Sequence, residues 1–194
     1  MKTHLPGPGN RKTPRAKKGS IGQARPLHYR TMLKNKNARF LFLTLLVVIL
    51  ASFVSSRVQT SGGEVRIHDI KIPTQNGQWV MADLFKPRAV TAENPAPLIV
   101  VVPGFQRSKE ALANIAIELS RRGFVVISID PYAQGRSSSS TSRRAATTEG
   151  YGMFAVVDYV HGSGNLNYVD TSRIGSTGHS AGGNAAIRGA NYFG

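Results

Sequence analysis

A pentapeptide near the carboxyl end of the chain, Gly178-His179-Ser180-Ala181-Gly182, places glycines two residues before and two residues after a serine. This G-x-S-x-G pattern is typical of a serine nucleophile held on a sharp turn between a strand and a helix. The turn brings the neighbours of the serine almost into contact, and glycine permits this because it has no Cβ. A short β-like run precedes the pentapeptide at 173–177, and small residues that suit a helix follow at 181–190. The sequence therefore predicts a strand, a turn and a helix, with the Ser180 hydroxyl above the sheet.

Two continuously apolar, β-branched runs, 97–102 and 124–129, predict strands that are covered on both faces. Between them, residues 109–122 carry apolar side chains at a helical spacing. These side chains are Leu112, Ile115, Ala116 and Leu119. Gly123 stands where such a helix would end. A strand, a helix and a strand with short joints form a βαβ unit, so we expect a parallel sheet.

Further elements are expected on both sides of this unit. Residues 65–72 alternate as a strand does, and Asn76-Gly77 signals a hairpin whose returning strand covers 79–85. Residues 149–160 are expected to form a helix with one apolar side. The side chains on that side are Met153, Val156, Val157 and Val160. The folded domain is expected to comprise residues 64–194.

An apolar segment precedes this domain. Residues 40–56 are 17 uncharged residues between Arg39 and Arg57. As a helix they would span roughly 26 Å, at the short end of what a bilayer core requires. The segment is apolar all round, whereas a helix of a soluble domain has a polar face. It therefore predicts an uncleaved transmembrane anchor in contact with membrane lipid. A cleavable signal peptide is the alternative, although 39 residues precede the segment and Ala51-Ser52-Phe53 is a poor cleavage site.

The positive charge of the chain is concentrated before the anchor. The chain has 25 lysines and arginines against 10 acidic residues, a net charge of +15, but residues 1–39 hold 11 of the basic residues and no acidic one. This composition predicts a disordered tail, placed in the cytoplasm by its charge, with the folded domain on the other side of the membrane. The tail has one aromatic residue, Tyr29, so no specific nucleic-acid partner is expected. A polar linker over 57–63 follows the anchor.

The order of these parts resembles the α/β-hydrolase fold, from the hairpin to the G-x-S-x-G turn. The resemblance covers residues 64–194. Besides the pentapeptide, Val102-Pro-Gly-Phe105 is similar to the family's His-Gly-x turn, with proline in place of the histidine. The stretch Asp130-Pro-Tyr-Ala-Gln-Gly-Arg-Ser137 is similar to the family's Asp-x-x-Gly-x-Gly-x-Ser turn, although it lacks the first glycine.

The resemblance implies an α/β domain with a mostly parallel sheet. The sheet is expected to be incomplete, because the domain ends just after the helix that follows Ser180. It also implies a serine hydrolase of the esterase, lipase or peptidase type, which acts on a small-molecule ester or peptide and needs no cofactor or metal. Ser180 would be the nucleophile, with the backbone N–H groups of Phe105 and Ala181 as the oxyanion hole. Gly178 and Gly182 would be the elbow glycines. The chain has no cysteine, which excludes thiol catalysis and disulfides.

The acid and the base of such an enzyme are missing from the sequence. In the family both follow the serine, but the 14 residues after Ser180 contain no Asp, Glu or His. His161 and His179 precede it, and the side chain of His179 is expected to point away from it. Asp130 and Asp158 are expected to be a turn residue and a helix-surface charge. We therefore expect the N-terminal portion of a longer hydrolase. The alternative is a truncated or inactive membrane-tethered domain with a binding role.

Overall fold

The computed structural model describes residues 35–74, 77–139 and 149–193. The disordered tail predicted for residues 1–39 falls outside these ranges as far as residue 34. The first described element is helix α2, Lys36–Gln59, which is longer at both ends than the expected anchor over 40–56. Asn35 caps its start, because the Asn35 side-chain oxygen accepts a hydrogen bond of 3.0 Å from the N–H of Asn37.

Helix α2 is apolar on all sides, as its sequence predicts. None of its residues is buried, and its leucine, valine and phenylalanine side chains are exposed around the whole helix. At 1.5 Å per residue its 24 residues measure about 36 Å. Within the described residues it is the one helix long and apolar enough to cross a membrane, judged by length and composition.

A five-stranded sheet forms the centre of the domain. Its strands are β1 (Val65–Pro73), β2 (Trp79–Pro87), β3 (Ala96–Val102), β4 (Val125–Ile129) and β5 (Val169–Gly178). They lie in the order β1-β2-β4-β3-β5. β2 pairs antiparallel with both β1 and β4, whereas β3 pairs in parallel with both β4 and β5. The predicted α/β class and the hairpin are confirmed. The sheet is mixed, because the short connection between β1 and β2 can only join antiparallel strands.

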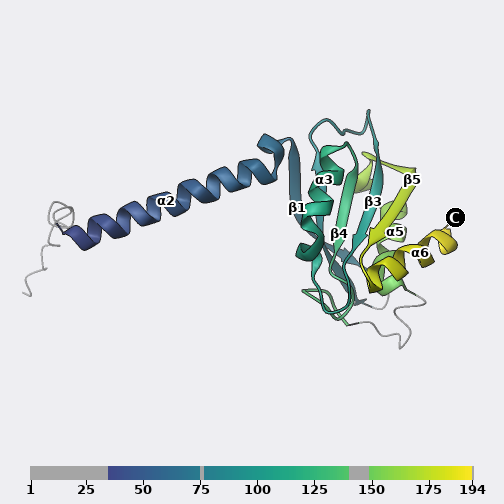
Figure 1. Ribbon diagram of the computed structural model, residues 1–194. Coiled ribbons are helices and arrows are strands. Elements are labelled where there is room, and N and C mark those ends of the chain that lie inside the picture. The colour runs from purple at the N-terminus through teal and green to yellow at the C-terminus, as the bar shows by residue number, and fades with distance from the viewer. Residues whose placement is uncertain (1–34, 75–76, 140–148, 194) are drawn as a thin grey trace, which may run out of the picture. The chain divides into compact units, whose positions relative to one another are not determined.

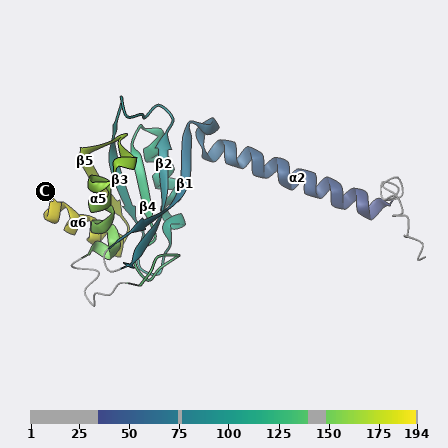
Figure 2. The ribbon, with the colours of Figure 1, turned by 180° about the vertical axis from the view of Figure 1, so that it is seen from behind.

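In the described residues, three α-helices and four short 3-10 turns accompany these strands. The helices are α3 (Ala113–Arg121), α5 (Met153–Gly162) and α6 (Ala181–Phe193). The turns are η1 (Ser61–Gly63), η3 (Lys109–Leu112), η4 (Gly150–Gly152) and η5 (Gly164–Leu166). α3 covers one face of the sheet, and α5 and α6 cover the other (Figures 1 and 2).

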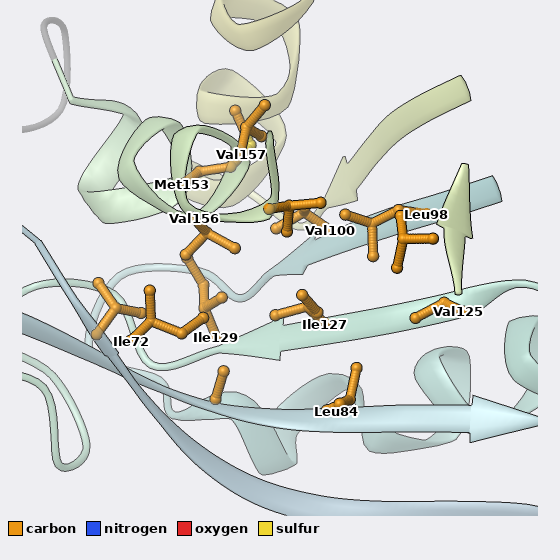
Figure 3. Close-up of a cluster of buried hydrophobic side chains, with 14 of the residues drawn as sticks. Ile72, Leu84, Leu98, Val100, Val125, Ile127, Ile129, Met153, Val156 and Val157 are labelled. Carbon is orange, nitrogen blue, oxygen red and sulfur yellow. The ribbon is translucent and has the colours of Figure 1, made fainter. Parts of the chain in front are cut away.

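The larger part of the core lies between the sheet and α5 (Figure 3). Met153, Val156 and Val157 project from α5 onto the apolar side chains of the central strands. All five residues of β4 are buried, as its continuously apolar sequence predicts. Each fully buried aliphatic side chain contributes roughly 1.5–3 kcal/mol, so this cluster is a main source of the stability of the domain.

The end of α3 follows its sequence closely. Gly123 has a φ of +97°, the left-handed conformation that favours glycine. Its N–H donates to the carbonyl oxygen of Ser120 at 3.0 Å, and the N–H of Phe124 donates to that of Leu119 at 3.3 Å. These two bonds form a Schellman motif, so the helix ends where the sequence predicts.

The start of this helical segment is different from the expectation. Residues 109–122 do not form one helix but the 3-10 turn η3 followed by α3. Ile115, expected on the apolar face, is 41% exposed, whereas Ile117 packs against the core. The other three predicted positions, Leu112, Ala116 and Leu119, do pack in the same core cluster, so the spacing identified the inner face despite the 3-10 turn.

Helix α5 also begins later than predicted, at Met153 and not near residue 149. Tyr151 and Gly152 have φ values of +56° and +100°, which an α-helix cannot accommodate. The four apolar positions predicted for its inner face are all buried. The helical periodicity therefore predicted the buried face of α5 correctly. The start of the helix is determined by the positive φ angles of Tyr151 and Gly152.

Candidate active site

The G-x-S-x-G pentapeptide forms a sharp turn between β5 and α6. Strand β5 ends at Gly178 and helix α6 begins at Ala181, which leaves only His179 and Ser180 between them. Ser180 is exposed and has a φ of +54°. A residue other than glycine adopts this left-handed conformation at a cost of roughly 1–2 kcal/mol. The strained backbone lifts the Ser180 side chain out of the sheet, the geometry that suits a nucleophile.

Both glycines of the pentapeptide lie against backbone. A Cβ added to Gly182 would lie 2.0 Å from the carbonyl oxygen of Val102 and 2.6 Å from that of Pro103. A Cβ added to Gly178 would lie 2.5 Å from the Val102 oxygen and from the carbonyl carbon of Gly182. The N–H of His179 also donates to the Val102 oxygen at 3.2 Å. The turn is thus packed onto the end of β3, where there is no room for a side chain.

Gly182→Ala is expected to destabilise the domain at the upper end of the roughly 1–3 kcal/mol typical of overpacking, because the atom that blocks the new Cβ is backbone and cannot rotate away. The matched control is Gly175→Ala in β5, where a Cβ would meet the Leu98 oxygen at 4.0 Å. The measurement is chemical unfolding followed by the fluorescence of Trp79, the one tryptophan of the chain. Equal stability of the two variants would contradict the steric role given to Gly182.

The loop over residues 103–108, here called the oxyanion loop, connects β3 to η3 beside the serine. A Cβ on Gly104 would lie 3.2 Å from Nδ1 of His179 and 3.4 Å from Cβ of Ser180, so this part of the loop adjoins the serine directly. Phe105 follows, with a side chain that is 66% exposed and so takes no part in the core. Within the described residues, no hydrogen-bond acceptor is found for the backbone N–H of Phe105 or Ala181. Both groups remain available as candidate oxyanion donors.

The segment over residues 130–137, here called the Asp130 turn, supports the oxyanion loop. The Asp130 carboxylate is buried, and its two oxygens accept hydrogen bonds from the N–H groups of Lys109 at 2.8 Å and Arg136 at 2.9 Å. A Cβ on Gly135 would lie 2.2 Å from the carboxylate carbon, so only glycine fits there. Ala133, which stands at the missing glycine, has a φ of +60°. The turn keeps the conformation that a glycine would favour and accommodates an alanine in it. Asp130 is a turn residue, as expected.

Two of the other acidic and basic candidates, Asp158 and His161, lie on α5, whereas His179 lies beside the serine. Nδ1 of His161 lies 3.0 Å from the Val157 carbonyl oxygen on its own helix. Asp158 is exposed on the outer side of α5, as expected. His179 neighbours Ser180 in sequence, and its ring lies against Gly104 in the oxyanion loop. The sequence reasoning missed this contact, because no local pattern predicts which loop lies next to the turn.

The structure also contains a groove of about 650 Å³ along the free edge of β5. It is lined by β5, α5 and α6, with His161, Ile187 and Phe193 among its residues, and none of Ser180, Phe105 or Ala181. The groove is therefore separate from the candidate active site. In the described part of the chain, no group of three or more His, Asp or Glu side chains is arranged to hold a metal ion.

Comparisons with known proteins show which family the chain is similar to. The model of a family described as PETase, PET hydrolase-like, matches residues 53–192. A bis(hydroxyethyl) terephthalate hydrolase of Streptomyces coelicolor is 28% identical over 101 residues, which are 52% of this chain and 30% of that enzyme. The chain thus spans less than a third of the length of this relative.

Solved structures with the same fold are also longer than this chain. A bacterial heroin esterase matches with a TM-score of 0.54 and 21% identity, over 84% of this chain and 49% of that protein. An esterase of Pyrococcus furiosus matches with a TM-score of 0.53 and 19% identity, over 67% of this chain and 48% of its own. At these identities the likeness establishes the fold.

Proposed function

Because the chain belongs to the PET hydrolase-like family, we propose that it carries the nucleophile and the oxyanion hole of a membrane-anchored serine esterase. The observation that carries the proposal is the turn at Ser180, an exposed serine with a φ of +54° between two glycines that contact backbone. A strained serine on a turn between a strand and a helix is the nucleophile arrangement of the α/β-hydrolase fold.

In the proposed reaction the Ser180 hydroxyl oxygen attacks the carbonyl carbon of an ester and gives up its proton to a histidine base. The carbonyl π electrons move to oxygen, and the N–H groups of Phe105 and Ala181 stabilise the resulting anion. One such donor is worth roughly 2.7–4 kcal/mol where it has been measured. Ala181 also begins helix α6, so the positive end of the helix dipole lies beside the same oxygen. Collapse of the intermediate expels the alcohol, which takes the proton, and water then releases the acid.

The base and its partner acid are proposed to lie outside these 194 residues. Serine is a weak nucleophile without a base, and in this fold the acid and the histidine follow the serine in the chain. The relatives support this placement, since the chain spans 30–49% of the three compared above. The substrate is proposed to be a small carboxylic ester, the class that the names of those relatives indicate.

The proposed organisation has a cytoplasmic basic tail over residues 1–39, an anchor over 40–56, a linker over 57–63 and an extracytoplasmic hydrolase domain from residue 64. Helix α2 supports the proposal of an anchor, because it is long enough to cross a membrane and is apolar on all sides. The basic residues before it support the orientation, because positive flanks stay on the cytoplasmic side.

The decisive experiment is labelling of the natural protein, extracted from membranes, with a fluorophosphonate probe. Attack by an activated serine displaces fluoride and leaves a covalent phosphonyl group, so mass spectrometry is expected to find the probe on the peptide that contains Ser180. Labelling should be lost when the probe competes with an excess of a hydrolysable ester. An unlabelled protein that is folded and of natural length would overturn the esterase function and favour a tethered domain that only binds.

A further inference from the structure

We propose that Gln134 is a positioning residue, whose side chain fixes the oxyanion loop so that the N–H of Phe105 faces Ser180. The inference rests on the proposed function, because it assigns a role within the same site. It begins from the shape of the loop. The N–H of Arg107 donates to the Gly104 carbonyl oxygen at 3.2 Å and closes a turn around Phe105.

This turn requires support from outside. Its third residue, Gln106, has a φ of +58°, a conformation characteristic of a type II turn and normally left to glycine. Gln106 is exposed, as are Phe105 and Arg107. A strained and exposed turn with a single internal hydrogen bond has alternative conformations available, and each would point the Phe105 N–H in a different direction.

Gln134 supplies the support. Its side-chain oxygen accepts a hydrogen bond of 2.9 Å from the N–H of Arg107, a shorter contact than the one inside the turn. The same N–H therefore holds both the turn and the neighbouring segment, 27 residues away in the chain. Because Arg107 closes the turn, fixing its peptide group also fixes the peptide groups on either side of Phe105.

Gln134 is itself held in place. Its N–H donates to the Pro131 carbonyl oxygen at 3.0 Å, and its carbonyl oxygen accepts from the N–H of Ser137 at 3.1 Å. Asp130 anchors the same turn through a buried carboxylate that also binds the N–H of Lys109. The Asp130 turn thus holds the chain at two points, at Arg107 in the oxyanion loop through Gln134 and at Lys109, just after the loop, through Asp130.

The two contacts are expected to have different consequences. The Asp130 contact fixes the start of η3 within the core, so its loss would unfold structure. The Gln134 contact fixes an exposed turn, so its loss would leave the fold intact and loosen one oxyanion donor. Complete removal of such a donor lowers kcat roughly 10²–10³-fold. Loosening it is expected to lower kcat by about 10-fold or more while KM changes little, because the oxyanion is absent from the bound ester and develops only as the transition state is approached.

The test compares Gln134→Met with Gln134→Glu in the natural protein, using a p-nitrophenyl ester. Methionine has a similar length but lacks the accepting oxygen, whereas glutamate keeps it. The methionine variant should lose about 10-fold or more in kcat at an unchanged KM, with a melting temperature within about 3 °C of the wild type. The glutamate variant should recover most of kcat. Hydrogen exchange should speed up at the Arg107 amide and not at the Lys109 amide.

An unchanged kcat in Gln134→Met, or a loss that appears only in KM, would overturn the proposal. So would faster exchange at Lys109 together with a lowered melting temperature, because that would make Gln134 a purely structural residue. If the wild-type protein neither hydrolyses the ester nor reacts with the fluorophosphonate, the proposed function fails and the catalytic role of Gln134 with it. The exchange rates at Arg107 would then still decide whether Gln134 holds the loop.

Discussion

Ser180→Ala is expected to lower kcat/KM for a p-nitrophenyl ester by about 10⁴-fold or more, equivalent to about 5.4 kcal/mol of transition-state stabilisation. The loss is large because the serine oxygen forms the covalent bond, and nothing else at the turn can replace it. The oxyanion hole would remain, so a small residual rate above that of water is expected. The measurement is steady-state kinetics on the natural protein, together with the extent of fluorophosphonate labelling.

The control is Ser176→Ala, which changes a serine of β5 four residues before Ser180. Its hydroxyl donates to the Ala186 carbonyl oxygen at 3.3 Å and lies on the groove at the edge of the sheet, away from the oxyanion loop. This variant should keep kcat/KM within about twofold, because it alters neither the nucleophile nor the oxyanion donors. If the two alanine variants lost the same activity, or if Ser180→Ala kept it, Ser180 would not be the nucleophile.

Lys109→Met is expected to cost about 3–5 kcal/mol of folding free energy. The Lys109 amine is buried, 2.7 Å from an Asp83 carboxylate oxygen, 3.6 Å from Asp69 and 3.1 Å from Glu110. Asp69 and Asp83 face each other across β1 and β2, a pairing of like charges that is unfavourable without a cation. Removal of the amine would leave these two carboxylates opposed, with the exposed Arg136 paired with Asp69.

The pKa values in this cluster indicate that its charges are satisfied. Burial lowers the pKa of Lys109, but the hydrogen bonds and the charges of Asp83 and Glu110 outweigh burial and raise it above its ordinary value. Hydrogen bonds from the Ser108 hydroxyl and from its own backbone N–H, followed by Lys109, lower the pKa of Glu110 to about 2. The Lys109 amine and the Glu110 carboxylate are therefore both charged at neutral pH and stabilise one another.

The Lys109 prediction is checked by chemical unfolding of three variants. Lys109→Met combined with Asp83→Asn should recover part of the loss, because it removes the unpaired charge along with its partner. Arg122→Met is the matched control. Arg122 forms an exposed pair with Glu118 at 3.0 Å, and its loss should cost less than about 1 kcal/mol. A cost for Lys109→Met no larger than that for Arg122→Met would show that the buried cluster contributes little.

Much of the fold could be predicted from the sequence, because the relevant patterns are local. Continuous apolar runs predicted β3 and β4, alternation predicted the β1–β2 hairpin, and the periodicity of α5 identified the four side chains that the structure buries. Gly123 predicted the end of α3. Each of these predictions depends on residues a few positions apart. Local sterics determine their backbone conformation, and the helix or strand repeat determines which side of the element each side chain occupies.

The sequence by itself determined the α/β class, the family, the apolar helix before the domain and the turn that carries Ser180. The tertiary structure alone decided what surrounds that serine. The sheet order β1-β2-β4-β3-β5 places the ends of β3 and β4 side by side, so that Gln134 reaches Arg107, and it places Lys109 over the opposed carboxylates of β1 and β2. Gln134 and Arg107 are 27 residues apart in the chain, and Lys109 and Asp83 are 26 residues apart. No local repeat connects them, because their distance depends on strand order and register, which the packing of the whole domain fixes at once.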